Sequence, residues 1–479
     1  MTVPSAVSAS ARVYDVAVIG GGVVGTAIAR ALSHHVLDVV LLEAGTDVGA
    51  GTSKSSTAIL HTGFDATPGS LEARLVRRGY ELLQAYTAET GIAVEATGAI
   101  LVAWTDEQAA SLPAIREKAA QNGVHDLLPL NASELYRAEP YLGRGALGGL
   151  RIPGESIVCP YSPPIAYATD ALANGAELLL ESPVIAVELG SECHVLRAPA
   201  RSVRARFVVN AAGLQSDAID AMFGNRRFTV RPRRGELIVY DKLARRLLNH
   251  VLLPVPTKTT KGVLVSPTVF GNVLLGPTAD DIDDKSDTGT TERGLASLLE
   301  KGKAILPALL AEEVTATYTG LRAATEHSDY QIHLDAAARY VCVGGIRSTG
   351  LSASLGIAEH VVGLLESAGL SLPPKATVTR IHMPAIGEAQ LRPHVHPDMI
   401  ARDSDYGRIV CHCERVSRGE IRDALTSPLP ARSLDALRRR TRCLQGRCQG
   451  FYCLAEVAAL ISERSGRSIS EVLGLERET

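Results

Sequence analysis

The stretch Tyr14-Asp15-Val16-Ala17-Val18-Ile19-Gly20-Gly21-Gly22-Val23-Val24-Gly25 decides the fold of this chain. Its first half is a β-rich apolar run, and its second half matches G-x-G-x-x-G at Gly20, Gly22 and Gly25. The glycines allow a tight turn and bring bare backbone close to a pyrophosphate, whose charge is stabilised by the amino end of the next helix. The stretch therefore predicts a strand, a phosphate-binding turn and a helix from Val24 to about Leu32.

A second apolar run, Val39 to Leu42, follows this helix and ends at Glu43. An acid about 20 residues beyond the glycine turn is placed to bind a ribose hydroxyl, and it would repel a 2′-phosphate. Strand, turn, helix, strand and acid thus occur in the order of a dinucleotide-binding unit. We expect an α/β Rossmann-like domain in which a dinucleotide contacts Gly20, Gly22, Val23, Val24, Gly25 and Glu43.

The composition narrows the class of protein. The chain has 479 residues, a formal net charge of -3 and 21% charged residues. This length predicts two or three folding units, and the charge balance argues against a nucleic-acid partner, which usually requires a basic excess. Residues 1–13 lack the basic and apolar regions of an export signal, so we expect a flexible tail and a cytoplasmic protein. Membrane association would at most be peripheral, at the inner face.

Five of the eight cysteines lie beyond residue 410. Thiolates at such short spacing, in a chain without an export signal, favour a metal or iron–sulfur centre over disulfides. A site of four thiolates suits either zinc or a 2Fe–2S cluster. Ser417-Arg418-Gly419-Glu420 predicts a helix that begins with a capping box. We therefore expect a small helical domain over 408–479, joined by a proline-containing linker over 371–407.

Three further segments resemble the FAD-contacting segments of the D-amino-acid-oxidase-like flavoprotein superfamily: Gly51 to Gly63, Val208 to Gly213 and Gly344 to Ser352. Within it, the chain most resembles FAD-dependent glycerol-3-phosphate dehydrogenases, and also L-2-hydroxyglutarate oxidases. The resemblance implies an FAD domain over 14–370, with a mixed β-sheet substrate domain built from inserts at about 94–164 and 228–333, an α/β (α+β) architecture. It also implies FAD contacts at Thr52, Ser53, Val184, Ala212, Gly213, Gly345, Arg347, Thr349, Gly350, Leu351 and Ser352.

Two side chains are candidates for the chemistry. In the resembling enzymes a histidine beside the flavin matches His61, and its pKa suits removal of a hydroxyl proton while hydride passes to flavin N5. Arg322 matches the position at which the superfamily anchors an anionic substrate, through paired hydrogen bonds from a guanidinium. Two alternatives remain: His61 could contact the flavin without transferring protons, and Arg322 could belong to a structural ion pair.

The C-terminal region resembles the bacterioferritin-associated-ferredoxin-like 2Fe–2S domain. The family pattern Cys-Gln-Gly-x-x-Cys is met by Cys448 and Cys453, which implies Cys411, Cys413, Cys448 and Cys453 as ligands. Cys443 could replace one of the last two or remain an unliganded neighbour. The arginines at 438, 439, 440 and 442 could offset an anionic cluster or form a docking face, although a solvated helix surface is the simplest interpretation.

Together these observations predict an FAD-dependent dehydrogenase of a small anionic hydroxy compound. Glycerol 3-phosphate, oxidised to dihydroxyacetone phosphate, is the first candidate substrate. Electrons would leave through the cluster to an acceptor protein or a quinone-linked subunit. An L-2-hydroxy-acid or amino-acid oxidising enzyme is the first alternative, because Gly69 to Leu75 resembles the 2-hydroxyglutarate oxidases. A redox-sensing or assembly module with a structural flavin is the second.

Overall fold

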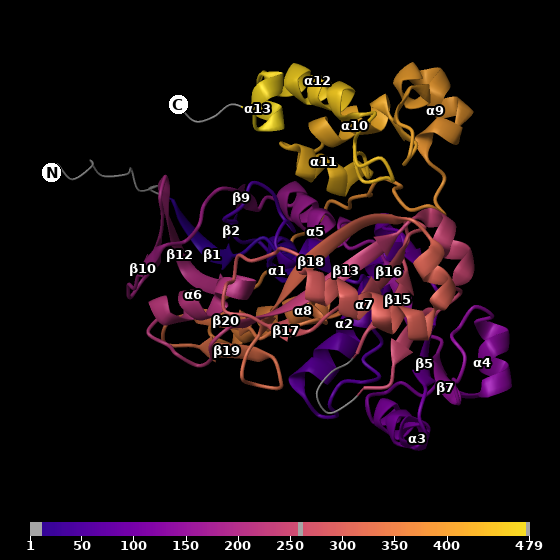
Figure 1. Ribbon diagram of the computed structural model, residues 1–479. Helices are drawn as coiled ribbons and strands as arrows, with labels where there is room; N and C mark the ends of the chain where they lie inside the picture. The colour runs from indigo at the N-terminus through magenta and orange to yellow at the C-terminus, as the bar shows by residue number, and fades with distance from the viewer. Residues whose placement is uncertain (1–11, 257–261, 476–479) are drawn as a thin grey trace.

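The computed structural model describes residues 12–256 and 262–475 (Figure 1). Residues 1–11 of the expected tail lie outside the described residues, and Val13, its last residue, is already the first residue of a strand. The chain forms two sheet-based regions and a helical C-terminal lobe, which stands at one end of the molecule in Figure 1.

The first sheet contains the predicted dinucleotide-binding unit. Its parallel part has the order β20-β12-β1-β2-β9, and β10, β11 and β19 add antiparallel pairs. Ile19 pairs with both Leu42 and Asn210, so these strands end at one edge. The strands are β1 (Val13–Ile19), β2 (Val39–Leu42), β9 (Glu177–Leu179), β10 (Ala186–Glu188), β11 (His194–Ala198), β12 (Arg201–Asn210), β19 (Gln331–Asp335) and β20 (Tyr340–Gly344).

Helices pack on both faces of this sheet. Successive side chains of β1 point to opposite faces, and those on both faces are apolar and buried. Val16 and Val18 face the larger core, which includes α1 and α8, whereas Ala17 and Ile19 face a smaller core that includes residues of α6. This alternation is expected for a strand that is buried on both sides. The helices are α1 (Val23–Ser33), α2 (Leu71–Thr90), α5 (Ser162–Ala173), α6 (Ser216–Met222) and α8 (Gly350–Ser367).

The second sheet has the order β17-β13-β16-β15-β14-β5-β7-β6, with β18 paired to β13. It has a core of its own, and α7 (Glu292–Ile305) packs against β13 and β16. The strands are β5 (Ala99–Ala103), β6 (Leu128–Asn131), β7 (Gly148–Ile152), β13 (Arg231–Tyr240), β14 (Val251–Pro254), β15 (Leu264–Pro267), β16 (Val273–Gly276), β17 (Asp280–Asp281) and β18 (Val314–Ala324).

All strands of the second sheet lie within the two ranges expected for the substrate domain, although not every strand in those ranges joins it. β19 pairs with β20 in the first sheet, because its apolar face adjoins the cofactor-domain core. β4 (Val94–Glu95) and β8 (Ser156–Val158) instead form a small sheet with β3 (Ile59–Leu60). The helices α3 (Asp106–Gln121) and α4 (Ala132–Ala138) lie between the strands of the first range.

The C-terminal lobe follows a connector that contains α9 (Pro397–Arg402). Its helix α10 begins with the predicted capping box: the Ser417 hydroxyl accepts from the Glu420 amide, and the Glu420 carboxylate accepts from the Ser417 amide. The lobe also has its own core. Its elements are β21 (Ile409–Cys411), β22 (Val416–Ser417), α10 (Arg418–Thr426), α11 (Leu434–Thr441), α12 (Leu454–Ser465) and α13 (Ile469–Leu473). Within the described ranges, no helix is both long enough and apolar enough to span a membrane.

Candidate active site and cysteine centre

A cavity of about 700 Å³ lies between the two sheets, at the edge where the strands of the first sheet end. The residues that follow β1, β2, β12 and β20 all contribute to its lining. Ligands of open α/β sheets bind at this edge, beyond the carboxyl ends of the strands. The second sheet forms the opposite wall, with contributions from β13, β15 and β18.

Backbone rather than side chains forms much of one cavity wall. A β-carbon on Gly25 would lie 1.9 Å from the carbonyl oxygen of Gly20, so only glycine lets α1 pack this closely against the turn. Both α1 and α8 begin at the cavity, where Val23, Val24, Gly350 and Leu351 line it. Neither helix is capped by the side chain of its own N-cap residue, although the Val23 amide of α1 donates to the Ser53 hydroxyl at 2.9 Å, and the positive ends of both helix dipoles lie at the cavity. This arrangement fits the phosphates and the flavin ring of FAD.

Most of the predicted cofactor residues line this cavity, but four do not: Gly25, Val184, Thr349 and Ser352. Thr349 instead donates to Glu72 at 2.7 Å, and Val184 packs against the smaller core beside β12. The residues that do line it are Gly20, Gly22, Val23, Val24, Glu43, Thr52, Ser53, Ala212, Gly213, Gly345, Arg347, Gly350 and Leu351.

Glu43 sits at the end of β2, as the dinucleotide pattern requires. Its two carboxylate oxygens accept hydrogen bonds from the amides of Gly21 and Gly45, both at 2.6 Å. These bonds hold the acid in the cavity wall beside the glycine turn. The carboxylate is therefore fixed where a ribose hydroxyl would be bound.

His61 lines the same cavity directly after β3. Its amide donates to the Ser352 hydroxyl at 2.8 Å, and its Nδ1 lies 2.9 Å from the Glu155 carboxylate. Glu155 is completely buried and also accepts from the amide and hydroxyl of Thr62, at 2.7 and 2.8 Å. The carboxylate thus fixes the orientation of the imidazole ring, as a carboxylate does for a catalytic histidine.

Sequence reasoning missed Glu155. It lies 94 residues from His61, in the turn between β7 and β8, and it belongs to no recognisable motif. Only the pairing of β8 with β3 brings the two side chains together.

Arg322 lines the cavity from β18. Its guanidinium donates to the Thr278 carbonyl at 3.3 and 3.4 Å, and among the described residues no carboxylate forms an ion pair with it. Burial, and after it the nearby charge of Arg233, lowers the pKa of Arg322 to about 10, so the group remains cationic at neutral pH. Gly235 on β13 makes room for it, because a β-carbon there would lie 2.6 Å from Nη2. Arg233, by contrast, is paired with Asp281 at 2.6 and 3.0 Å.

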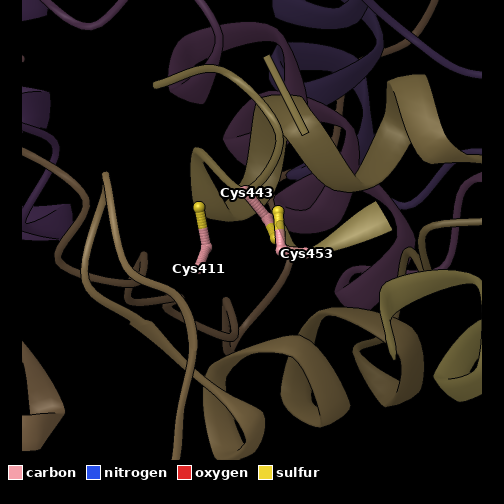
Figure 2. Close-up of side chains that lie close together, drawn as sticks. All are labelled: Cys411, Cys443 and Cys453. Carbon is pink, nitrogen blue, oxygen red and sulfur yellow. The ribbon is translucent and has the colours of Figure 1, made fainter. Parts of the chain in front are cut away.

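The five C-terminal cysteines fall into two groups. The sulfurs of Cys411, Cys443 and Cys453 lie within 4.8 Å of one another, and all three side chains are buried (Figure 2). Cys413 and Cys448 are partly exposed; burial, and with it the neighbouring thiol of Cys448, raises the pKa of Cys413, so these two side chains lie close together. Hydrogen bonds from Cys443 and Cys453 lower the pKa of Cys411, and the same contact with Cys411 raises the pKa of Cys443. Five thiols are thus gathered where four are needed for a 2Fe–2S cluster.

Three of the C-terminal arginines join the lobe to the rest of the molecule. Arg439, Arg440 and Arg442 are each less than 10% exposed, so the expectation of a solvated helix surface is wrong for them. Arg439 and Arg440 both pair with Asp47, which is 2% exposed and lies in the loop after β2. Burial alone would raise the pKa of Asp47, but hydrogen bonds and charge from the two arginines lower it.

Comparison with known families agrees with this geometry. A family model described as FAD dependent oxidoreductase matches residues 15–364, nearly three quarters of the chain. The chain belongs to this family. A second model, the BFD-like [2Fe-2S] binding domain, matches residues 409–463. The predicted cofactors, FAD and a 2Fe–2S cluster, are confirmed, and so is the prediction of an oxidoreductase.

Relatives and solved structures support the same assignment. The chain is 32% identical over 460 residues to a glycerol 3-phosphate dehydrogenase of Caloramator mitchellensis, and the match covers 96% of each protein. It is 31% identical over 300 residues to a mitochondrial L-2-hydroxyglutarate dehydrogenase of Bos taurus, which covers 57% of this chain and 62% of the relative. The structure of an L-alpha-glycerophosphate oxidase from Mycoplasma pneumoniae with FAD bound superposes with a TM-score of 0.73 and 26% identity, over 78% of this chain and all of the other. These matches confirm the predicted fold class.

Proposed function

We propose that this enzyme oxidises glycerol 3-phosphate to dihydroxyacetone phosphate and passes the electrons through its 2Fe–2S domain to a separate acceptor. One observation carries the proposal: a half-buried arginine without a carboxylate partner among the described residues shares a cavity with a carboxylate-oriented histidine. One relative, matched over 96% of this chain, is a glycerol 3-phosphate dehydrogenase. An anionic end group and a hydroxyl to be oxidised are the features that these two side chains would recognise.

FAD, when bound, takes up the hydride that leaves the substrate carbon. Arg322 would bind the phosphate, and the desolvated position of its guanidinium strengthens that attraction. His61 would accept the hydroxyl proton at Nε2, because its Nδ1 is engaged with Glu155. The buried Glu155 carboxylate would stabilise the imidazolium that results. Loss of one hydride and one proton converts the secondary alcohol into the ketone.

The Gly69 to Leu75 segment, which resembles the 2-hydroxyglutarate oxidases, has a structural explanation. Ser70 caps the amino end of α2 by accepting from the Ala73 amide at 3.0 Å. Glu72 accepts from Thr349 and from Arg347, at 2.7 and 3.2 Å, and so ties α2 to the start of α8. These contacts give the segment a structural role, and Glu72 also lines the cavity.

The substrate can be tested by mixing the oxidised enzyme anaerobically with each candidate and recording flavin absorbance. Glycerol 3-phosphate should bleach the flavin, whereas glycerol should not, because it lacks the anion that Arg322 binds. L-2-hydroxyglutarate and amino acids serve as competing substrates. The proposal is wrong if one of these reduces the flavin while glycerol 3-phosphate leaves it oxidised.

For the cluster, we propose Cys411, Cys413, Cys448 and Cys453 as ligands. Each iron of a 2Fe–2S cluster binds two protein ligands, so the ligands come in two pairs. The Cys448 thiol lies close enough to Cys413 to affect its pKa, which supports these two as one pair. The second pair then comes from the buried group of three, in which Cys443 is the surplus thiol.

A further inference from the structure

The two cysteine loops, residues 412–415 between β21 and β22 and residues 442–453 between α11 and α12, contain an unusual share of strained backbone. Four of the seven non-glycine residues with left-handed φ in the described ranges lie there: Arg415, Arg442, Leu444 and Gln449. Arg442 ends α11 with φ 73° and ψ −1° and directly precedes Cys443. Helices often end in this conformation with glycine, since a β-carbon makes it unfavourable. An arginine at this position therefore suggests that its side chain does something glycine could not.

The Arg442 side chain links both cysteine loops. Its Nε lies 3.3 Å from the carboxylate of Glu414, the residue after Cys413, and its Nη1 donates to the Gln445 side chain at 2.7 Å. Glu414 is almost completely buried and lies 3.2 Å from Lys242 as well. The guanidinium thus joins the loop of Cys413 to the loop of Cys443 and Cys448.

The same guanidinium also contacts the flavin domain. It lies 4.0 Å from the ring centroid of Phe270, and its Nη2 donates to the Asn272 side chain at 3.4 Å. Both residues belong to the turn between β15 and β16, and Leu264 of β15 lines the cavity. A cation over an aromatic face is attracted by the ring, and more strongly when it is buried. Phe270 is itself stacked on Tyr161, just before α5.

A second buried contact connects the lobe to the cavity. Arg440 binds Asp47 through two hydrogen bonds, of 2.7 and 2.8 Å, and Arg439 adds a third. Two residues after Asp47, the segment from Gly49 to Gly51 lines the cavity. Removing one partner of an ion pair this deeply buried strongly destabilises the fold, because the other charge is left buried and unpaired. Such a pair therefore holds the two segments in one relative position.

We propose that Arg439, Arg440 and Arg442 form an arginine clamp that holds the cysteine loops at one fixed position relative to the flavin cavity. Arg442 is its central positioning residue for electron transfer from the flavin to the cluster. The clamp proposal rests on the proposed electron route through the 2Fe–2S domain. In each transfer step one electron moves from reduced flavin to the oxidised cluster, which passes it to the acceptor before it takes the next, and the proton held by the reduced flavin is released to solvent. Because electron-transfer rates fall steeply with distance, a small displacement of the loops would slow this step before it affects substrate oxidation.

The test follows two steps separately in the full-length, cofactor-loaded enzyme under anaerobic conditions. Glycerol 3-phosphate or photochemical reduction delivers electrons to the flavin, and absorbance and electron paramagnetic resonance report flavin and cluster reduction. In Arg442→Gln, flavin reduction should keep the wild-type rate, and cluster reduction should slow on the order of tenfold or more. Arg447→Gln is the matched control: it removes the same charge from the same loop, and although Arg447 also reaches the second-sheet region, at Asp241 after β13, it is half exposed, so its ion pair should contribute little to fixing the loop. Its cluster should be reduced at the wild-type rate.

A redox titration distinguishes positioning from loss of charge. A cation beside the cluster favours the reduced, more negative form, so the midpoint potential should fall in Arg442→Gln and be retained in Arg442→Lys. The lysine variant should still transfer electrons slowly, because it lacks the planar contacts with Phe270 and Glu414. If the Arg442→Gln protein does not bind a cluster, the Phe270→Leu variant tests the clamp instead. This variant removes the aromatic ring under Arg442 and leaves every charged side chain and every cysteine in place. It too should slow cluster reduction.

Three results would overturn the clamp. One is a wild-type rate of cluster reduction in both Arg442→Gln and Phe270→Leu. Another is equal slowing in the Arg447→Gln control. The third is a wild-type cluster that stays oxidised after photochemical reduction of the flavin, because the electron route itself would then be absent. By contrast, failure of glycerol 3-phosphate to bleach the flavin would contradict only the proposed substrate, since photochemical reduction tests the clamp without it.

Discussion

The flavin cavity and the cysteine centre of this molecule are built in opposite ways. Backbone forms much of the cavity: four strands end at one edge, and two helices begin there without a capping side chain from their own N-cap residues. The cysteine centre consists of side chains on loops, and buried charged groups attach it to the rest of the molecule. The flavin cavity, which depends on close backbone contacts, should tolerate few substitutions of its glycines. The cysteine centre has one thiol more than a cluster needs, so it should tolerate the loss of that one cysteine.

The strongest test of this comparison is Gly25→Ala. The added β-carbon would overlap the Gly20 carbonyl at 1.9 Å, so α1 must move away from the turn. We expect loss of roughly 1–3 kcal/mol or more of unfolding free energy, together with loss of bound FAD. Flavin absorbance of the purified protein and chemical denaturation measure the two effects.

Gly363→Ala provides the control for the same substitution. Gly363 lies in α8, is exposed, and an added β-carbon would meet nothing within 4 Å. This variant should retain FAD and gain about 0.5–1 kcal/mol from the helix propensity of alanine. If both variants lose FAD, or neither does, close backbone approach is not what forms the cavity.

The next largest effect is expected for the histidine in the cavity. His61→Ala should slow reduction of the flavin by glycerol 3-phosphate by about 100- to 10,000-fold, because the hydroxyl proton loses its acceptor. Glu155→Gln should slow it less, since the amide can still contact the ring but leaves an imidazolium without a counter-charge. Anaerobic stopped-flow absorbance measures both rates. Unchanged rates in both variants, with FAD fully bound, would leave His61 as a flavin contact only.

The contrast between the two regions also explains which site residues could be predicted from the sequence. The order of strand, glycine turn, helix and acid fixes where backbone groups must lie, so the cavity residues from Gly20 to Glu43 could be identified from local pattern. Glu155 could not, because its role depends on a pairing between β8 and β3 that no local pattern encodes. Ser352 was identified as a cofactor residue, and the structure shows it supporting the His61 backbone.

A smaller effect is expected when Arg322 in the cavity is replaced, and it should appear as a weaker apparent affinity for the substrate. Arg322→Gln should raise KM for glycerol 3-phosphate on the order of 30-fold, equivalent to about 2 kcal/mol, because the phosphate loses a desolvated partner. In the wild type, the lowered pKa of about 10 means that the guanidinium is charged below that pH and loses its charge as pH rises through it. KM should therefore rise between pH 9 and 11. A flat profile together with an unchanged KM in the variant would show that Arg322 does not bind the substrate.

At the cysteine centre, sequence predicted the number of thiols but not their grouping. C-x-C and the two later C-x4-C spacings are compatible with several sets of four. The loops reach their positions through left-handed residues and a contact with the flavin domain, and both are properties of the folded chain. The same reason explains why three arginines of α11 and its cap were expected at a solvated surface but are buried against Asp47, Glu414 and Phe270.

The smallest effect is expected for Cys443→Ala, and it separates a surplus thiol from a ligand. If Cys411, Cys413, Cys448 and Cys453 bind the cluster, this variant should retain two irons, two acid-labile sulfides and the visible spectrum of the wild type. Cys453→Ala should lose them, although its thiol belongs to the same buried group of three. Iron and sulfide assays on both variants, with flavin content as the control for folding, make the comparison.

The opposite result would be equally informative about the two regions. Loss of the cluster in Cys443→Ala with retention in Cys448→Ala would place the ligands at Cys411, Cys413, Cys443 and Cys453. The partly exposed Cys448 would then be the surplus thiol, and its contact with Cys413 would not mark a ligand pair. FAD should remain bound in every one of these variants, because its cavity lies at the strand ends and none of the five cysteines lines it. Loss of FAD in a cysteine variant would mean that the lobe helps to hold the cavity closed through Asp47 and Phe270.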